Sequence, residues 1–365
     1  MIFWFCVFAT LIWLGLAFFW HQFWRVDQRL TLTPEPLENY PAIAAIVPAR
    51  NEQETIATSI GKLQEQDYAG KFSITVANDA STDNTADILT QLQSGSANLT
   101  VVDTNQLPQG WAGKMWALHQ AILVAETEKP DYYWLSDADI AHQPGVLTTL
   151  VAHAQTNDLA LVSQMVALRC TTFWEKLLVP AFIFYFTLIY PFRAINNPAS
   201  AIAGAAGGSI LIRREVLESI GGIKALKGAI IDDCTLGKLI KKAGYKIWLG
   251  FGERSLSLRG YDHLSDFWQM VQRSAYAQLH YSPVLLVFAV AGIMVSHILP
   301  AMLLCLPALV VMAAIYWPTV RFYGLSPLWS LTLPIAALLF GAMTISSALS
   351  HHLGWSNQWR NREIG

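Results

Sequence analysis

The charged residues of this chain are distributed very unevenly, and this distribution limits the possible folds more than any single motif does. Residues 1–24 contain no Asp, Glu, Lys or Arg, and between Arg273 and Arg360 the only such residue is Arg321. The 249 residues from Arg25 to Arg273 hold 46 of the 50 charged side chains. Long uncharged apolar segments are typical of membrane helices, whereas the middle has the composition of a globular domain. The sequence therefore predicts a soluble module between hydrophobic ends.

The N-terminal segment predicts a transmembrane anchor over residues 1–24. About 20 apolar residues are enough to cross the hydrocarbon core of a bilayer. The segment lacks the basic start and the small-residue cleavage site of a signal peptide, so we expect it to be retained. Arg25 and Arg29 follow it and predict a cytoplasmic position for the next residues, which form a linker over 25–41.

The C-terminal segment predicts a membrane region over residues 282–350 with two or three helices, of which three are favoured. Pro283–Trp317 is uncharged and long enough for a tight hairpin, whose turn we expect at His297 and Pro300. A further span is expected from Leu325 to Leu349.

These spans predict a multi-pass protein of the inner (cell) membrane. Placing Arg321 inside together with the first arginines gives four spans and a cytoplasmic catalytic domain. Residues 351–365 would then form a tail.

The soluble module is predicted over residues 42–281 and contains one apolar insert, 177–192. The insert is interrupted by Pro180 and Pro191 and is shorter than a typical span. We therefore expect an interfacial or buried helix there rather than a membrane crossing.

Net charge and cysteine content exclude two classes of function. The net charge of −2 gives no basic surface for nucleic acid, so no nucleic-acid partner is expected. None of the four cysteines forms a Cys-x-x-Cys pair; they are Cys6, Cys170, Cys234 and Cys305. We therefore expect neither a disulfide framework nor a zinc site.

Short apolar runs alternate with segments of helical spacing in the soluble module. This alternation predicts an α/β fold with a mainly parallel, Rossmann-like sheet covered on both faces. In such sheets a ligand binds beyond the carboxyl ends of the strands. The first strands are expected at Ala42–Val47, Phe72–Ala77, Leu99–Val102 and Tyr132–Leu135.

Polar residues follow three of these predicted strands. Asp137 and Asp139 follow the fourth strand, and their spacing puts both carboxylates on one side of an extended backbone, where they suit Mg²⁺ or Mn²⁺. The other loops carry candidates for nucleotide binding, although helix caps and Asx turns explain each loop equally well. These candidates are Arg50, Asn51, Glu52 and Asp79.

Two further groups of residues are candidates for chemistry. Asp232 and Asp233 open a predicted helix, where either carboxylate could serve as a general base or simply complement the helix dipole. Lys114 and Arg273 could contact phosphate, or could be a helix-start lysine and an interfacial arginine.

Taken together, these motifs resemble the family 2 glycosyltransferases of GT-A fold. More closely, the chain resembles the hopene-associated glycosyltransferases found with bacterial hopanoid genes. The supporting motifs are Pro48-Ala49-Arg50-Asn51-Glu52, Asn78-Asp79-Ala80-Ser81-Thr82-Asp83, Gly110-Trp111-Ala112-Gly113-Lys114, Ser136-Asp137-Ala138-Asp139, Gly207-Gly208 and Ile231-Asp232-Asp233-Cys234.

The resemblance implies a GT-A catalytic domain that binds a nucleotide-sugar donor and a lipid acceptor at the membrane. It implies a divalent metal ion, Mg or Mn, held by Asp139 with help from Asp137, and inverting transfer of a single sugar. It implies Asp233 as the base, with Asp232 as the alternative. A hopanoid-related acceptor belongs to this expectation. The residues implied to bind the donor are Arg50, Asn51, Glu52, Asp79, Lys114, Asp137 and Arg273.

One departure from the family bears on the type of product. The Gln-x-x-Arg-Trp motif of processive synthases is not intact, because the segment around Arg273 keeps only the arginine. This favours a single transfer over chain elongation. The alternatives are a processive polysaccharide synthase and a catalytically inactive membrane scaffold of the same fold.

Overall fold

The computed structural model describes residues 1–30, 37, 39–229, 231–354, 358–359 and 362–363. The predicted linker and tail therefore lie partly outside the described residues. The chain divides into a helical unit and a sheet unit. The helical unit comprises Met1–Asp27, Arg169–Ala194 and Gly260–Asn357, and the sheet unit comprises Gln28–Leu168, Ile195–Arg259 and Gln358–Gly365. In this division the predicted insert 177–192 belongs to the helical unit.

In the part of the chain that is described, one large mixed sheet has the strand order β3-β2-β1-β4-β7-β6-β8-β5. Strands β1 to β4 are parallel to one another, whereas β7 is antiparallel to both β4 and β6, and β5 is antiparallel to β8. The predicted parallel arrangement is confirmed for β1 to β4, whereas the other half of the sheet is mixed. The strands are β1 (Ile43–Ala49), β2 (Phe72–Asn78), β3 (Leu99–Asp103), β4 (Tyr132–Ser136), β5 (Ile140–His142), β6 (Leu161–Ala167), β7 (Ser209–Arg213) and β8 (Ile247–Ser257).

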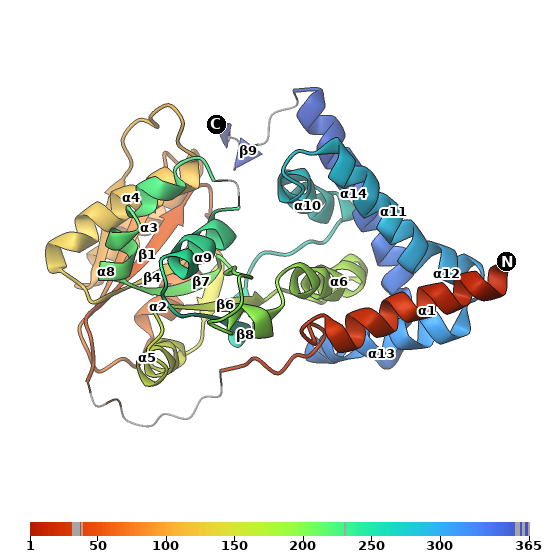
Figure 1. The fold of residues 1–365 in the computed structure, drawn as a ribbon. Helices are drawn as coiled ribbons and strands as arrows, with labels where there is room; N and C mark the ends of the chain where they lie inside the picture. The colour runs from red at the N-terminus through yellow and green to blue at the C-terminus, as the bar shows by residue number, and fades with distance from the viewer. Residues whose placement is uncertain (31–36, 38, 230, 355–357, 360–361, 364–365) are drawn as a thin grey trace. The chain divides into compact units, whose positions relative to one another are not determined.

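Helices cover both faces of the sheet because its central strands are apolar on both sides. Every residue of β1 is buried, as a strand between two helical layers requires. Residues of α2 (Ile56–Gln64), α3 (Thr85–Ser94) and α5 (Val146–Thr156) share one core cluster with alternate residues of β1. Helix α4 (Gly113–Ala125) contacts β1 and β2 and lies on the other side of the sheet from α5 (Figure 1).

The remaining short elements of the sheet unit lie before β4, between β7 and β8, and near the C-terminus. They are η1 (Glu126–Glu128), α8 (Arg214–Ser219), η2 (Ile223–Leu226), α9 (Asp232–Lys242) and the two-stranded pair β9 (Gln358–Trp359) and β10 (Arg362–Glu363). The helix predicted at Asp232 is α9. Strands β5 and β6 were not predicted, because β5 has only three residues and β6 is an apolar run without a flanking motif.

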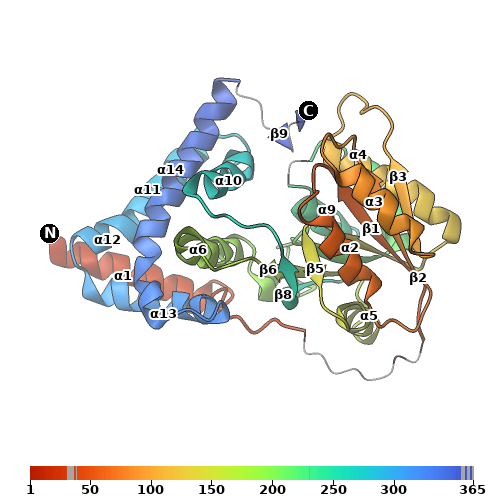
Figure 2. The ribbon, with the colours of Figure 1, turned by 180° about the vertical axis from the view of Figure 1, so that it is seen from behind.

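The helical unit consists of apolar helices and short connecting turns. Figures 1 and 2 show α1 lying along α13 and α10 lying beside α14, as their contacts require. The elements are α1 (Ile2–Phe19), α6 (Phe173–Ile189), α7 (Phe192–Ile195), α10 (Leu264–Gln278), α11 (Pro283–Ile293), η3 (Met294–Ile298), α12 (Leu299–Met302), α13 (Leu306–Phe322), η4 (Pro327–Thr332) and α14 (Leu333–His352).

Four helical segments of the described residues are long and apolar enough to cross a membrane: Ile2–Phe19, Phe173–Ile195, Pro283–Met302 and Pro327–His352. Helix α13 is apolar but shorter. The segment that contains α6 differs from the others, because 61% of its apolar window is buried within the protein. A buried helix was expected at this insert, and the helix continues through Pro180.

The predicted hairpin turn at His297 and Pro300 is wrong, because the helix continues through both residues. The chain turns instead at residues 303–305, where Leu304 has a positive φ. A proline has no N–H to bond the carbonyl four residues earlier. A short π-helix, η3, lies just before Pro300. The carbonyl four residues before Pro300 is that of Ser296, and it accepts a hydrogen bond of 2.8 Å from the indole N–H of Trp13. That contact replaces the hydrogen bond that Pro300 cannot make.

The sequence predicts no disulfide framework, yet the described residues contain one disulfide. Cys6 of α1 and Cys305, which precedes α13, form a disulfide with their Cα atoms 5.3 Å apart. Their separation of 299 residues along the chain hid the pairing from the sequence, because only the packing of α1 on α13 brings them together.

Candidate active site

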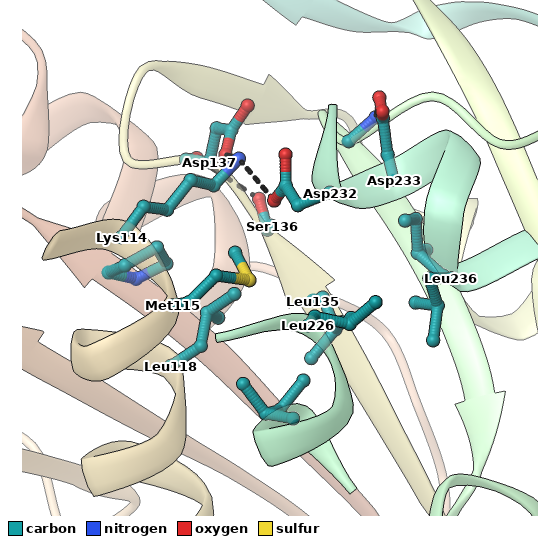
Figure 3. Close-up of a pocket in the computed structure, with 14 residues that line it drawn as sticks. Lys114, Met115, Leu118, Leu135, Ser136, Asp137, Leu226, Asp232, Asp233 and Leu236 are labelled. Carbon is teal, nitrogen blue, oxygen red and sulfur yellow. Dashed lines mark hydrogen bonds and ion pairs between the residues drawn. The ribbon is translucent and has the colours of Figure 1, made fainter. Parts of the chain in front are cut away.

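A pocket in the sheet unit gathers Lys114, Asp137, Asp232 and Asp233. Figure 3 shows the amino group of Lys114 between the carboxylates of Asp137 and Asp232, at distances of 2.7 Å and 3.7 Å. Aliphatic side chains lie beneath these charged groups (Figure 3); they include Met115, Leu118, Leu135, Leu226 and Leu236. The pocket therefore has a charged upper part and an apolar floor.

Three different elements bring these residues to the pocket. Asp137 follows the carboxyl end of β4, Lys114 lies in the first turn of α4, and Asp232 and Asp233 open α9. Helix α9 approaches closely because Gly237 faces the backbone of Gly204, where a Cβ atom would lie only 2.8 Å away.

Asp233 is held by two backbone N–H groups. Gly207 donates to its Oδ2 at 2.8 Å, and Cys234 donates to its Oδ1 at 2.7 Å. Burial raises the pKa of Asp233 to about 6, and the charge of Asp232 adds to this, whereas Lys114 and the two N–H donors act in the opposite direction.

Lys114 is held in its charged form by its neighbours. Burial lowers the pKa of Lys114, but the charges of Asp137 and Asp232 outweigh burial and raise it well above its usual value. Lys114 is therefore a permanent cation beside both acidic motifs.

Asp139 lies in a second cluster, with a residue that the sequence analysis did not single out. The Nε of Arg259 is 3.0 Å from Oδ2 of Asp139, and its terminal nitrogen is 3.2 Å from Oε1 of Glu52. Arg259 follows the last strand of the sheet, and its position after a strand end was the only signal in the sequence.

The loops after β1 and β2 are joined to each other. Arg50 donates to the backbone carbonyl of Asp79 and lies 3.8 Å from its carboxylate, which also accepts from Thr104 at 2.8 Å. Asn51 accepts a hydrogen bond from the N–H of Thr82 at 2.8 Å. The side chain of Asp79 is fully buried. The roles of these residues toward a nucleotide stay predictions.

Arg273 lies in α10, within the helical unit, and its predicted contact with phosphate also stays a prediction.

A buried polar network lies directly below the end of β4. The imidazole of His142 is 2.9 Å from the hydroxyls of Ser136 and Ser255, and Ser255 donates to Gln164 at 3.0 Å. Burial lowers the pKa of His142 to about 3, so the ring is neutral. Because Ser136 precedes Asp137, this network fixes the strand end that presents the acidic motif.

Carboxylate oxygens suit a divalent cation, and metal binding by Asp137 and Asp139 stays a prediction. Asp137 and Asp139 are each ion-paired with a side chain of the protein, so both carboxylates already face positive charge. Among the described residues no three His, Cys, Asp or Glu side chains form a metal cluster. Two carboxylates that leave further positions for diphosphate oxygens and water are nevertheless a usual arrangement for Mg²⁺.

Comparison with known proteins identifies the kind of domain that carries this pocket. Residues 44–221 match the model of the family Glycosyl transferase family 2. A Synechocystis beta-monoglucosyldiacylglycerol synthase is 26% identical over 191 residues, which cover 50% of this chain and 37% of that protein. The chain thus spans well under half the length of this relative.

A solved structure shares the fold over nearly the whole chain. The Pyrobaculum calidifontis mannosyltransferase PcManGT, in complex with GDP-Man and Mn²⁺, has a TM-score of 0.60 and 19% identity, covering 97% of this chain and 99% of that one. At this identity the likeness shows the fold. With the family match, it shows a Glycosyl transferase family 2 domain of GT-A fold over residues 44–221.

Proposed function

We propose that this protein is a membrane-bound glycosyltransferase that transfers a single sugar from a nucleotide-sugar donor to a lipid hydroxyl. One observation carries the proposal: Asp233, a carboxylate whose pKa burial raises to about 6, lies in one pocket with the permanent cation Lys114 and with Asp137 at the carboxyl end of β4. General bases work best with a pKa near the working pH, and a leaving diphosphate needs positive charge.

The proposed reaction is a direct displacement with inversion. The acceptor hydroxyl attacks the anomeric carbon, Asp233 takes the hydroxyl proton, and the bond from that carbon to the diphosphate oxygen breaks. The nucleoside diphosphate leaves with the electron pair. Asp232 raises the pKa of Asp233 and interacts with Lys114, so we assign it a supporting role rather than that of the base.

Lys114 is proposed to neutralise the departing diphosphate. Asp139, assisted by Asp137, would hold a Mg²⁺ or Mn²⁺ ion, which supplies further positive charge to the leaving group. The donor would also contact Asp79, Arg273 and the Arg50–Glu52 loop.

The lipid acceptor is supported by two observations. The similar Synechocystis protein is by name a synthase of a glucosylated diacylglycerol, and several helices of this chain are apolar enough to lie in a membrane. We propose a multi-pass protein of the inner membrane with its catalytic domain on the cytoplasmic side. A hopanoid-related lipid is one acceptor to include in the test, beside diacylglycerol.

The test is a transfer assay with the full chain in lipid nanodiscs. UDP- and GDP-linked sugars are offered with diacylglycerol or a hopanoid alcohol, and the lipids are analysed by mass spectrometry. A product one sugar heavier than the acceptor, lost in Asp233→Asn and in Asp139→Asn, supports the proposal. A polymer would support a processive synthase, and the absence of both donor binding and product would support an inactive scaffold.

A further inference from the structure

Arg259 lies between two carboxylates that come from different parts of the sheet unit. Its contacts of 3.0 Å to Asp139 and 3.2 Å to Glu52 use two different nitrogens. A guanidinium group can bracket two carboxylates because its N–H donors point in several fixed directions within one plane. Arg259 therefore links the loop after β1 to the acidic loop after β4.

The backbone fixes this arrangement. Strand β5 pairs with β8 so that Ile140 lies opposite Ser257. The N–H of Leu258 also donates to the carbonyl of Asp139 at 2.7 Å. Sheet register thus brings Arg259 and Asp139 together, so their contact is not a chance meeting of long surface side chains.

The contact is also shielded from water. The side chain of Asp139 is 14% exposed and that of Glu52 is 9% exposed, while that of Arg259 is 30% exposed. Ion pairs that are partly removed from water interact more strongly than exposed ones. The carboxylate expected to be the main metal ligand therefore already holds a cation of the protein itself.

We propose that Arg259 is the resident counter-ion of Asp139 and makes metal binding depend on the nucleotide. This inference rests on the proposed function. A divalent ion at Asp139 would lie close to the guanidinium group, and two cations at one carboxylate repel each other. A nucleoside diphosphate brings oxygens that attract both cations and offset this repulsion. When Asp139 binds the metal, Arg259 keeps its ion pair with Glu52, so the partly buried guanidinium group still has a counter-ion.

The consequence is positive coupling between metal and nucleotide. Without nucleotide, Mn²⁺ binds weakly because it must compete with Arg259. With nucleotide, both cations are accommodated. Removing the guanidinium group should strengthen Mn²⁺ binding in the absence of nucleotide and reduce the benefit that nucleotide gives.

The test measures free Mn²⁺ by electron paramagnetic resonance, with the full chain in detergent, with and without saturating UDP or GDP. We expect nucleotide to tighten Mn²⁺ binding by about tenfold in the wild type. Arg259→Gln should bind Mn²⁺ about tenfold more tightly than the wild type without nucleotide. Unchanged or weaker nucleotide-free binding in Arg259→Gln would overturn the proposal.

Arg213→Gln is the matched control. Arg213 is 24% exposed, is paired with Asp158, and lies at the end of β7 away from Ser209, which pairs with Ser136 at the pocket. This variant should bind Mn²⁺ like the wild type, and a similar tightening of Mn²⁺ binding in it would overturn the proposal.

If Arg259→Gln does not fold, Arg259→Lys takes its place. A single ammonium group brackets two carboxylates poorly, so its nucleotide-free Mn²⁺ affinity should rise about threefold, and an unchanged affinity would overturn the proposal. Wild type that binds no Mn²⁺ even with nucleotide would instead refute the metal site of the proposed function, and this inference with it.

Discussion

The backbone N–H of Gly207 donates a 2.8 Å hydrogen bond to Oδ2 of Asp233. Gly207 lies just before β7, and β7 pairs along its length with β4, which ends at Ser136. The proposed base is therefore fixed to the strand pair that also presents the acidic motif. Its orientation depends on the backbone, which moves less than a long side chain would.

Replacing Asp233 by Asn is expected to lower transfer by about 10²–10⁴-fold, because the neutral amide cannot accept the proton. The same substitution is not expected to lower the stability of the folded protein. The pKa of Asp233 is higher in the folded protein than its usual 3.8, so the ionised carboxylate weakens folding, and this cost grows as the pH rises toward about 6 and is complete above it. The variant should therefore be at least as stable as the wild type at pH 7. Thermal unfolding and transfer are measured on the same sample, and a joint loss of both would contradict the assignment.

The pH profile of transfer should show an acid limb near pH 6, where Asp233 takes up a proton. The charge of Asp232 raises this pKa, so Asp232→Asn should move the limb to lower pH. Lys114 lowers it, so Lys114→Met should move the limb to higher pH. The values of kcat/KM are compared between pH 4.5 and 8. Limbs that stay in place in both variants would show that another group is titrating.

Gly237→Ala should displace α9 and with it both aspartates. The added Cβ would lie 2.8 Å from the backbone of Gly204, and overpacking of this kind costs about 1–3 kcal/mol. Gly61→Ala is the control in another helix, because a Cβ there meets nothing within 4 Å. That control should be neutral or more stable, by up to about 1 kcal/mol. Chemical denaturation and transfer rates are compared, and equal behaviour of the two variants would contradict the close approach of α9.

His142→Ala should destabilise the sheet unit by about 2–4 kcal/mol, because the hydroxyls of Ser136 and Ser255 lose their shared buried partner. Burial lowers the pKa of His142 from 6.5 to about 3, so the stability that the ring contributes is present above pH 6.5 and is lost as the pH falls toward 3. The difference in stability between wild type and variant should therefore shrink between pH 6.5 and 4. Unfolding curves at several pH values check this, and a constant difference would argue against a buried neutral ring.

Loss of the Cys6–Cys305 disulfide should lower the stability of the helical unit by about 2–4 kcal/mol. Peptide mapping without reducing agent should detect the cross-linked pair. The double variant Cys6→Ser with Cys305→Ser should unfold at a lower temperature than the wild type, whereas Cys170→Ser, whose thiol lies outside this disulfide, should retain the cross-link. Unlinked peptides from the untreated protein would refute the pairing.

The sequence by itself determined the parts of this protein that depend on local pattern. The apolar ends and the first four strands with the polar residues after them were predicted correctly, because periodicity and composition act over a few residues. Asp137 and Asp232–Asp233 were identified in this way, and the structure brings them together in one pocket.

Only the tertiary structure decided which charges meet. It paired Lys114 with both acidic motifs, placed Arg259 on Asp139, and joined Cys6 to Cys305. It also moved the turn of the predicted hairpin beyond Pro300, where Trp13 of α1 donates to the carbonyl of Ser296, which Pro300 cannot bond. Each of these contacts joins residues far apart in the chain, and the pairing of such residues depends on sheet register and helix packing, which no local pattern encodes.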